Sequence, residues 1–232
     1  MGAGVQAGLV DRHQALEDVV MTDVCPFTLG TDVSIETSPG QFDSGHFQPI
    51  IERNTVIPVS RVVRNYTLQK GQKQVMISIY QGESPRVSDN VLLGTLNILV
   101  PHNKEEHEGF DIRFTYDVSG VLEVLVTILS TDKTQRLIIE GNPGALSQDE
   151  IDKRFKSLGK IKVHPRDKAE NTAMIARLQK VYENQLGEIR KHVGFRLSEF
   201  EAVLAKQNDT DIEQLRTELN AWLTDIENMD VF

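Results

Sequence analysis

Two histidines and two glutamates stand close together in the sequence, and metal sites and hydrolytic centres use these side-chain types. The segment is His102-Asn103-Lys104-Glu105-Glu106-His107, and imidazole and carboxylate groups are common zinc ligands. Its spacing matches neither H-E-x-x-H nor H-x-x-E-H, in which one helical turn aligns the ligands. The segment also follows Pro101 in polar surroundings. We therefore expect a solvated loop with no metal ion, and a metal hydrolase is the weakest alternative.

The other residues that could carry chemistry lack the partners that the chemistry requires. Cys25 is the single cysteine, so no disulfide can form within the chain, and no histidine marks it as a nucleophile. Gly2, Gly4 and Gly8 do not have the G-x-G-x-x-G spacing. The chain contains neither a G-x-x-x-x-G-K-[ST] phosphate loop nor a G-x-S-x-G turn. The sequence therefore predicts no catalytic residue and no cofactor in this chain.

Composition narrows the possible partners. The net charge of -9 argues against binding to nucleic acid, which needs a dense Lys/Arg face. No apolar run approaches the roughly 20 residues that span a bilayer. The first residues do not have the basic start and apolar core of a secretory signal. We expect a cytoplasmic protein without a membrane or nucleic-acid partner.

Short apolar or alternating runs between about residues 24 and 141 are typical of strands. Residues 74–80 alternate, with Val75, Ile77 and Ile79 on one face. Residues 70–72 and 117–120 each have turn composition, and each predicts a hairpin. The candidate strands are Phe27–Val33, Phe47–Ile51, Ser60–Leu68, Gln74–Gln81, Val91–Val100, Phe110–Tyr116, Leu122–Ser130 and Gln135–Glu140.

From residue 147 onward the period becomes helical. Ser147 and Glu150 form a capping box at the start of a helix that we expect to end near Gly159 in a left-handed cap. Apolar residues at spacings of three and four then predict one long helix over 175–204. Thr210 with Glu213 predicts a second capping box and a last helix, antiparallel to the long one.

The predicted fold is an antiparallel β-sandwich of about eight strands, followed by a helical part of about three helices. Such a fold does not name a function. The apolar stripes of the strands suit a core and a peptide groove equally well. An interaction module that associates through its helical hairpin therefore stays open beside any binding function.

Several motifs resemble the seventy-kilodalton heat-shock (DnaK) family, and they follow one another in the order found in that family. The N-terminal motif is similar to the last helix of the family's ATPase domain, and residues 18–24 resemble its interdomain linker. The matching stretches are Gly2–Gly8, Asp18–Val24, Pro26–Gly30, Ile51–Pro58, Tyr80–Glu83, Asp117–Leu122 and Leu146–Ile151. The phrases at 49–55 and 80–83 look closest to the HscC branch of bacterial chaperones.

The resemblance implies a division of the chain and a function. Residues 1–17 would be the end of an ATPase domain, 18–24 the linker, 25–143 a β-sandwich that binds peptides and 144–232 a helical lid. The function would be binding of extended hydrophobic peptide segments of client proteins. A separate ATPase domain that holds ATP and Mg would control this binding allosterically, together with a J-domain co-chaperone. This chain by itself would then not be an enzyme, whereas the full-length protein would be an ATPase.

The resemblance also implies roles for individual residues. Ser34 and Leu68 fall where the family has the two residues that arch over the peptide. The residues expected to bind peptide are Thr31, Val33, Ser34, Thr67, Leu68, Val75, Ile77 and Phe110. The linker residues are Asp18, Val19, Val20, Met21 and Asp23, and the domain-docking residues are Arg53 and Pro58.

Four departures from the family pattern predict a grip unlike that of DnaK. The segment 34–47 is longer and is expected to be a long loop, which brings Phe42 or Phe47 toward the groove. Lys70 stands where an acidic residue latches the lid, and Ser119 replaces an aspartate that helps domain docking. Met21-Thr22 makes the linker less apolar. The freed linker and the exposed helical stripe also predict possible self-association of the chain.

Overall fold

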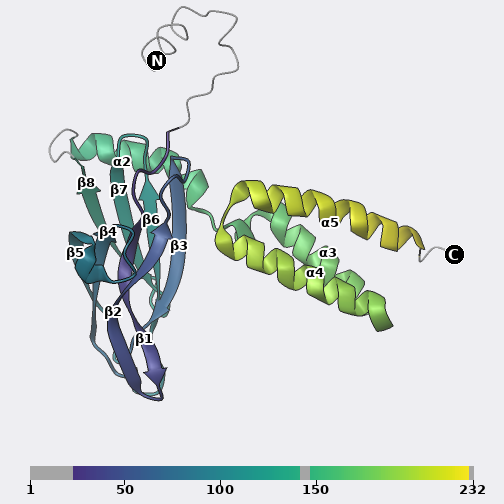
Figure 1. Ribbon diagram of the computed structural model, residues 1–232, viewed down its shortest axis with the longest axis horizontal. Helices are drawn as coiled ribbons and strands as arrows, with labels where there is room; N and C mark the ends of the chain where they lie inside the picture. The colour runs from purple at the N-terminus through teal and green to yellow at the C-terminus, as the bar shows by residue number, and fades with distance from the viewer. Residues whose placement is uncertain (1–22, 142–146, 230–232) are drawn as a thin grey trace, which may run out of the picture. The chain divides into compact units, whose positions relative to one another are not determined.

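The computed structural model describes residues 23–141 and 147–229, which belong to two compact units. The first unit ends at Phe155 and contains two four-stranded antiparallel sheets, with the orders β2-β1-β4-β5 and β3-β6-β7-β8 (Figure 1). The predicted eight-stranded sandwich is therefore confirmed. Its strands are β1 (Leu29–Ser38), β2 (Gln41–Ile51), β3 (Val59–Tyr66), β4 (Gln74–Gln81), β5 (Val91–Leu99), β6 (Gly109–Tyr116), β7 (Val121–Ile128) and β8 (Thr134–Glu140).

The alternating pattern of β4 places its side chains as the sequence predicts. Ile77 and Ile79 are buried, and Val75 packs against the same core, whereas Met76 is exposed. This core lies between the two sheets and also includes Phe110 and other large side chains. Its fully buried members include Ile51, Ile98, Ile112, Phe114, Leu122, Val124 and Val126. Burial of such side chains is the main favourable contribution to folding.

The expected long loop at 34–47 is wrong, because β1 and β2 continue through this segment as a paired hairpin. Their register extends to Ser38↔Gln41, and Gly40 at the turn has a φ of 76°. The register shifts between Val33 and Ile35 and again between Glu36 and Ser38. These irregularities interrupt the alternation that would have predicted two longer strands.

The predicted hairpin at residues 70–72 is also wrong. β3 and β4 flank this segment but belong to different sheets, so the connection crosses from one layer of the sandwich to the other. The hairpin predicted at 117–120 is confirmed, since β6 and β7 pair directly. There the Asp117 carboxylate accepts hydrogen bonds from the backbone N–H groups of Ser119 and Val121.

Helix α2 (Gln148–Ser157) follows β8 and lies across one end of the sandwich (Figure 1). The capping box is confirmed, because the Ser147 N–H and hydroxyl both donate to Glu150. Two arginines tie the helix to the sheet. Arg154 donates to Ser119 at 2.6 Å, and Arg136 contacts Asp152 and the buried Glu123 at 2.5 and 2.7 Å. Ser119 thus takes part in holding α2 in place.

The second unit begins at Lys156 and contains three longer helices instead of the expected two. They are α3 (Ala169–Asn184), α4 (Gly187–Lys206) and α5 (Asp209–Met229). The prediction of one continuous helix over 175–204 is wrong, since the chain leaves the helix at Gln185 and re-enters it at Gly187, whose φ is 62°. A separate core joins the helices, with Leu178, Phe200, Leu204, Leu219 and Leu223 fully buried.

Two predicted helix ends differ from the structure. α2 passes into a 3-10 segment, Leu158–Lys162, and Gly159 is not among the residues with positive φ, so the left-handed cap is not formed there. At the start of α5 the cap is Asn208 instead of Thr210, because the Asn208 side-chain oxygen accepts from the Thr210 N–H. An asparagine satisfies the first free N–H groups of a helix as well as a threonine does.

Candidate functional site

The pairing between β1 and β4 stops partway along both strands. Its register contains only Leu29↔Gln81, Gly30↔Tyr80 and Thr31↔Ile79. β1 nevertheless stays paired with β2 as far as Ser38, and β4 stays paired with β5 from Gln74. Among the described residues, the facing edges of Asp32–Ser38 and Gln74–Ile77 are therefore not joined by ladder hydrogen bonds. We call this opening between the two strands the β1–β4 fork.

Side chains of β1 close the ladder at the base of the fork. The Thr31 hydroxyl donates to the Ser78 carbonyl oxygen at 3.0 Å, and the Asp32 carboxylate accepts from the Ser78 N–H at 3.2 Å. Ser78 thereby has both backbone groups satisfied without a strand partner on this side. The two strands can diverge from this point without leaving these buried polar groups unpaired.

The predicted peptide-binding residues lie on the elements around this end of the sandwich. Ile77 and Phe110 are buried in the core between the sheets, and Val33 and Val75 are half-buried on β1 and β4, the two arms of the fork. Leu68 follows β3 and is 40% exposed. The Ser34 hydroxyl bonds the Ser44 hydroxyl across the β1–β2 hairpin at 2.9 Å, so this side chain is directed toward β2.

Exposed apolar side chains gather at the same end of the sandwich. Ile35 and Phe42 lie on the β1–β2 hairpin and are 48% and 42% exposed, and Leu99 at the end of β5 is 72% exposed. Phe47, the other residue predicted to line the groove, is less exposed than these, because its ring is half-buried beside Gly30. Ile35, which lies within β1, and Leu99, which ends β5, were not singled out from the sequence. The signal that could have found them is an apolar side chain in a strand that the core does not cover.

The β3–β4 connection, residues 67–73, borders the fork and is bound to the β5–β6 connection. Thr67 is buried, and its N–H donates to the Glu108 carbonyl oxygen while its hydroxyl oxygen accepts from the Glu108 N–H. These groups are already satisfied within the chain. Thr67 therefore supports the neighbouring Leu68 and does not offer its own N–H to a ligand.

An ion cluster fastens the β1–β2 hairpin to the loop that follows β4. The Asp43 carboxylate contacts Arg86 at 2.7 Å and His46 at 2.8 Å, and Arg86 also donates to the Ser44 carbonyl oxygen. The hydrogen bond from Arg86, followed by that from His46, lowers the pKa of Asp43 to about 2. The cluster fixes the arm of the fork that carries Ile35 and Phe42.

The lowered pKa of Asp43 predicts how this fastening responds to acid. Because the folded pKa lies below the ordinary value of 3.8, its contribution to stability is complete above that value and is lost as the pH falls toward 2. An NMR titration of the Asp43 carboxyl group should give a midpoint near 2 in the wild-type chain. The midpoint should rise toward the ordinary value in Arg86→Gln, and an unchanged midpoint would contradict the assigned cause.

The predicted docking residues lie at the opposite end of the sandwich. Arg53 is 3.8 Å from Glu83, and Pro58 is exposed at the start of β3 after a cis peptide bond. The carbonyl oxygen of Asp23 accepts from the Ile57 N–H at 3.0 Å. The predicted ATPase helix at 1–17 and the other predicted linker residues, Asp18, Val19, Val20 and Met21, lie outside the described residues.

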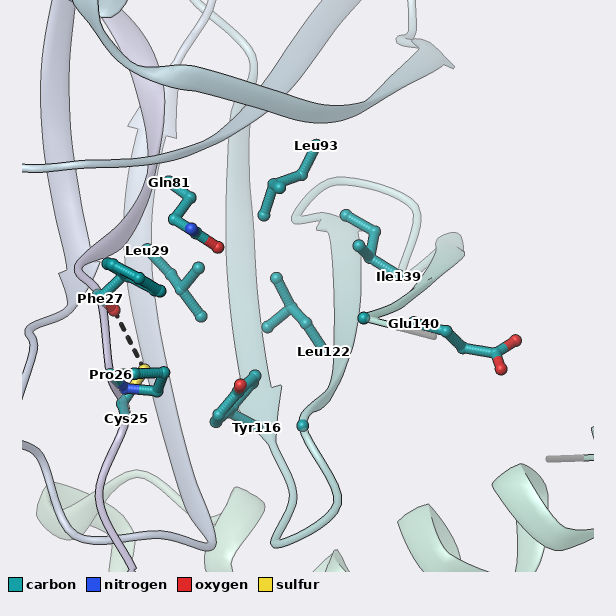
Figure 2. A pocket seen from close by; sticks show the side chains of 12 residues that line it. Cys25, Pro26, Phe27, Leu29, Gln81, Leu93, Tyr116, Leu122, Ile139 and Glu140 are labelled. Carbon is teal, nitrogen blue, oxygen red and sulfur yellow. Dashed lines mark hydrogen bonds between the residues drawn. The ribbon is translucent and has the colours of Figure 1, made fainter. Parts of the chain in front are cut away.

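A cavity of about 310 Å³ opens between the sheets at this opposite end (Figure 2). Its lining is mainly apolar and comes from residues 25–27, from the start of β1 and from the neighbouring ends of β4, β5, β6, β7 and β8. The Cys25 thiol donates to the Phe27 carbonyl oxygen at 3.1 Å, and burial raises the pKa of this thiol. The Glu140 carboxylate points away from the cavity (Figure 2). A thiol held neutral in apolar surroundings is a packing group and not a nucleophile.

His102 and His107, the candidate metal ligands, bind protein oxygen atoms. His102 Nδ1 is 2.7 Å from the Gly71 carbonyl oxygen, and His107 Nδ1 is 2.6 Å from that of Thr67. Within residues 23–141 and 147–229, no three or more histidine, cysteine, aspartate or glutamate side chains gather in a metal-binding group. No helix in the same ranges combines the length and apolar character needed to cross a bilayer.

Comparison with known proteins matches the chain to one protein family. The model of the Hsp70 protein family matches residues 1–230. The chain is 31% identical to the chaperone protein DnaK of Cenarchaeum symbiosum (strain A) over 232 residues, which cover 95% of this chain and 33% of the relative.

Two bacterial relatives are similar to the chain at the same level. The chaperone protein DnaK of Thermosipho africanus (strain TCF52B) is 30% identical over 177 residues, covering 75% of this chain and 28% of the relative. That of Thermosipho melanesiensis is 27% identical over 222 residues, covering 94% and 34%. The chain thus spans about a third of the length of the curated relatives that it matches.

Proposed function

Because the chain belongs to the Hsp70 family, we propose that it binds extended apolar segments of client polypeptides in the β1–β4 fork. The observation that carries this proposal is the end of the β1–β4 ladder at Thr31↔Ile79. Beyond that pair both strands remain ordered by their outer neighbours. Their facing edges can therefore offer backbone groups to a chain placed between them.

The side chains around the fork suit an apolar residue of a client. Ile77 and Phe110, which are buried, would form the floor of the binding site, and the half-buried Val33 and Val75 would form its walls. A leucine side chain that becomes buried there gains about 1.5–3 kcal/mol relative to water. Leu68 and the β1–β2 hairpin would cover the bound segment, in the arch roles assigned to Leu68 and Ser34.

Control by a nucleotide is part of the same proposal. An ATPase domain with ATP and Mg would act on the sandwich through Asp18–Asp23, docking against Arg53 and Pro58, and a J-domain co-chaperone would stimulate it. Asp23 is bound to Ile57 and Arg53 to Thr28, which supports a path from the linker into β1. The motifs at 49–55 and 80–83 support placement in the HscC branch. We propose a cytoplasmic location and no catalysis by this chain itself.

Peptide titration tests the proposal. The chain without nucleotide should bind a fluorescent heptapeptide with a central leucine, because the fork is already open in the sandwich. The same peptide with aspartate at its centre should bind at least about tenfold more weakly, since a carboxylate would lose its hydration on the apolar floor. Equal affinity for the two peptides, or no binding of the leucine peptide, would contradict the proposal.

A second candidate function is self-association through the helical unit. Leu186 is 77% exposed, Phe195 is 66% exposed and Ile189 is 44% exposed, all within α4 or directly before it. Sedimentation and peptide titration of the chain and of a Leu186→Ser, Phe195→Ser variant separate the two candidates. If the chain is an interaction module, sedimentation should show oligomers that dissociate in the variant. If it is a peptide receptor, titration should show the same peptide affinity in both.

A further inference from the structure

We propose that His102 and His107 are positioning residues, which hold the β3–β4 connection in place and thereby slow the release of a bound peptide. The first part concerns the loop alone, and the second part rests on the proposed function. Neither histidine belongs to the residues that line the fork. Both project from the β5–β6 connection onto the segment that carries Leu68.

His107 binds the beginning of the connection. Its Nδ1 atom is 2.6 Å from the carbonyl oxygen of Thr67. Two further hydrogen bonds join Thr67 to Glu108, at 2.9 Å from the Thr67 N–H and at 3.0 Å to the Thr67 hydroxyl oxygen. The Glu108 carboxylate in turn accepts from the Ser130 N–H at 3.3 Å. Residue 67 is thus fixed directly before Leu68.

His102 binds the far side of the same connection. Its Nδ1 atom is 2.7 Å from the Gly71 carbonyl oxygen, and the Gly71 N–H donates to the Asn103 carbonyl oxygen at 2.5 Å. Gly71 has a φ of 73°, and a Cβ atom there would lie 3.1 Å from the His102 ring. The glycine therefore permits both the turn and the close approach of the imidazole.

The two contacts determine that Nδ1 of each ring carries a hydrogen. A carbonyl oxygen only accepts hydrogen bonds, so each Nδ1 atom must carry a hydrogen. A neutral ring with its hydrogen on Nδ1 has its lone pair on Nε2. The two histidines thus act as hydrogen-bond donors toward the backbone.

The two histidine contacts lie on both sides of a three-residue segment. Leu68, Gln69 and Lys70 stand between Thr67 and Gly71, so this short segment is held at its two ends by one imidazole each. Because β3 and β4 belong to different sheets, no ladder joins them to restrain the crossing. The β5–β6 connection supplies the restraint in its place.

Substitution by alanine, asparagine and glutamine tests this assignment in the whole chain. Asparagine carries its amide nitrogen on Cγ, as histidine carries Nδ1, whereas glutamine places it one bond further out. His102→Ala and His107→Ala should each accelerate hydrogen exchange of the Gly71 and Thr67 amides about three- to tenfold without peptide, as expected for a lost neutral hydrogen bond. The asparagine variants should restore slow exchange more fully than the glutamine variants.

The same variants are then compared in peptide release. Dissociation of the leucine-centred heptapeptide should accelerate about three- to tenfold in each alanine variant, and asparagine should again restore it. Ring-nitrogen NMR should place the hydrogen on Nδ1 in both wild-type histidines. Hydrogen on Nε2 alone, or unchanged amide exchange in the alanine variants, would overturn the anchoring.

The two measurements also separate this proposal from the proposed function. Faster exchange with unchanged peptide dissociation would overturn the positioning role while leaving peptide binding intact. A wild-type chain that binds no peptide would refute the proposed function and the effect on release, and exchange would still decide whether the histidines anchor the connection.

Discussion

Val75→Phe is expected to weaken binding of the leucine-centred heptapeptide by about 100-fold, or roughly 2.7 kcal/mol. Val75 is half-buried at the start of β4, which is one arm of the fork, and it packs against the core of the sandwich. A phenyl ring at this position cannot be absorbed by a core that is already filled by Ile77 and Phe110. It should therefore occupy the space that the central leucine needs. Fluorescence titration measures the change.

Val91→Phe is the matched control for this prediction. Val91 pairs with Gln81 at the opposite end of the sandwich and is 60% exposed, so the added ring stays in solvent. Its peptide affinity should equal that of the wild-type chain within about twofold. Thermal unfolding of both variants checks that the sandwich is intact. Equal affinity in Val75→Phe and Val91→Phe would remove Val75 from the site.

Phe114→Ala is expected to lower the free energy of unfolding of the sandwich by about 3–5 kcal/mol. Phe114 is fully buried in the central strand β6, between the partners Arg61 and Val124. Removing its ring leaves a cavity in a core that neighbouring strands cannot close. The helical unit has a core of its own and should keep its stability. Denaturant unfolding, monitored through hydrogen exchange of the β6 amides, measures the change in the free energy of unfolding.

Leu219→Ala gives the reciprocal experiment in the helical unit. Leu219 is fully buried within the core shared by α3, α4 and α5, so the substitution should cost that unit about 2–5 kcal/mol. Trp222, the single tryptophan, packs against this core and reports on it by fluorescence. If Phe114→Ala shifts the Trp222 transition as much as Leu219→Ala does, the two units do not unfold independently.

The sequence predicts the strands well wherever alternation is regular. β4 begins and ends at the predicted residues because Val75, Ile77 and Ile79 mark its inner face without interruption. The β1–β2 hairpin escapes prediction for the opposite reason. Its register shifts at three places along the two strands, and each shift interrupts the regular alternation of the pairing. Local periodicity cannot follow a strand through such irregularities.

Two larger errors have long-range causes. Lys70-Gly71-Gln72 has the composition of a hairpin turn, but whether β4 pairs with β3 or crosses to the other sheet is decided by partners far away in the sequence. In the helical unit, Leu186 continues the apolar spacing of 175–204 and yet is 77% exposed. The break at Gln185 allows α4 to return along α3. This arrangement is stabilised by the packing of three helices, which local spacing does not reveal.

The residues of the candidate site could be proposed from the sequence, but the strand pairing and hydrogen bonds around them could not. Resemblance to a family assigns Leu68 and Val75, and the structure adds that the pairing of β1 with β4 ends at Thr31↔Ile79. The histidine spacing matches neither H-E-x-x-H nor H-x-x-E-H. It contains no signal for the backbone carbonyl oxygens that the two rings bind, because those belong to residues more than 30 positions earlier.

Photo-crosslinking tests the central proposal most directly, since it locates the bound segment. A heptapeptide with a photoreactive leucine analogue at its centre is irradiated with the wild-type chain, and the attached residues are identified by mass spectrometry. We predict attachment to the arms of the fork and to Leu68, at residues 33–35, 68 and 75, and its loss with excess unlabelled peptide. Attachment confined to α3–α5, or to the cavity beside Cys25, would contradict the account.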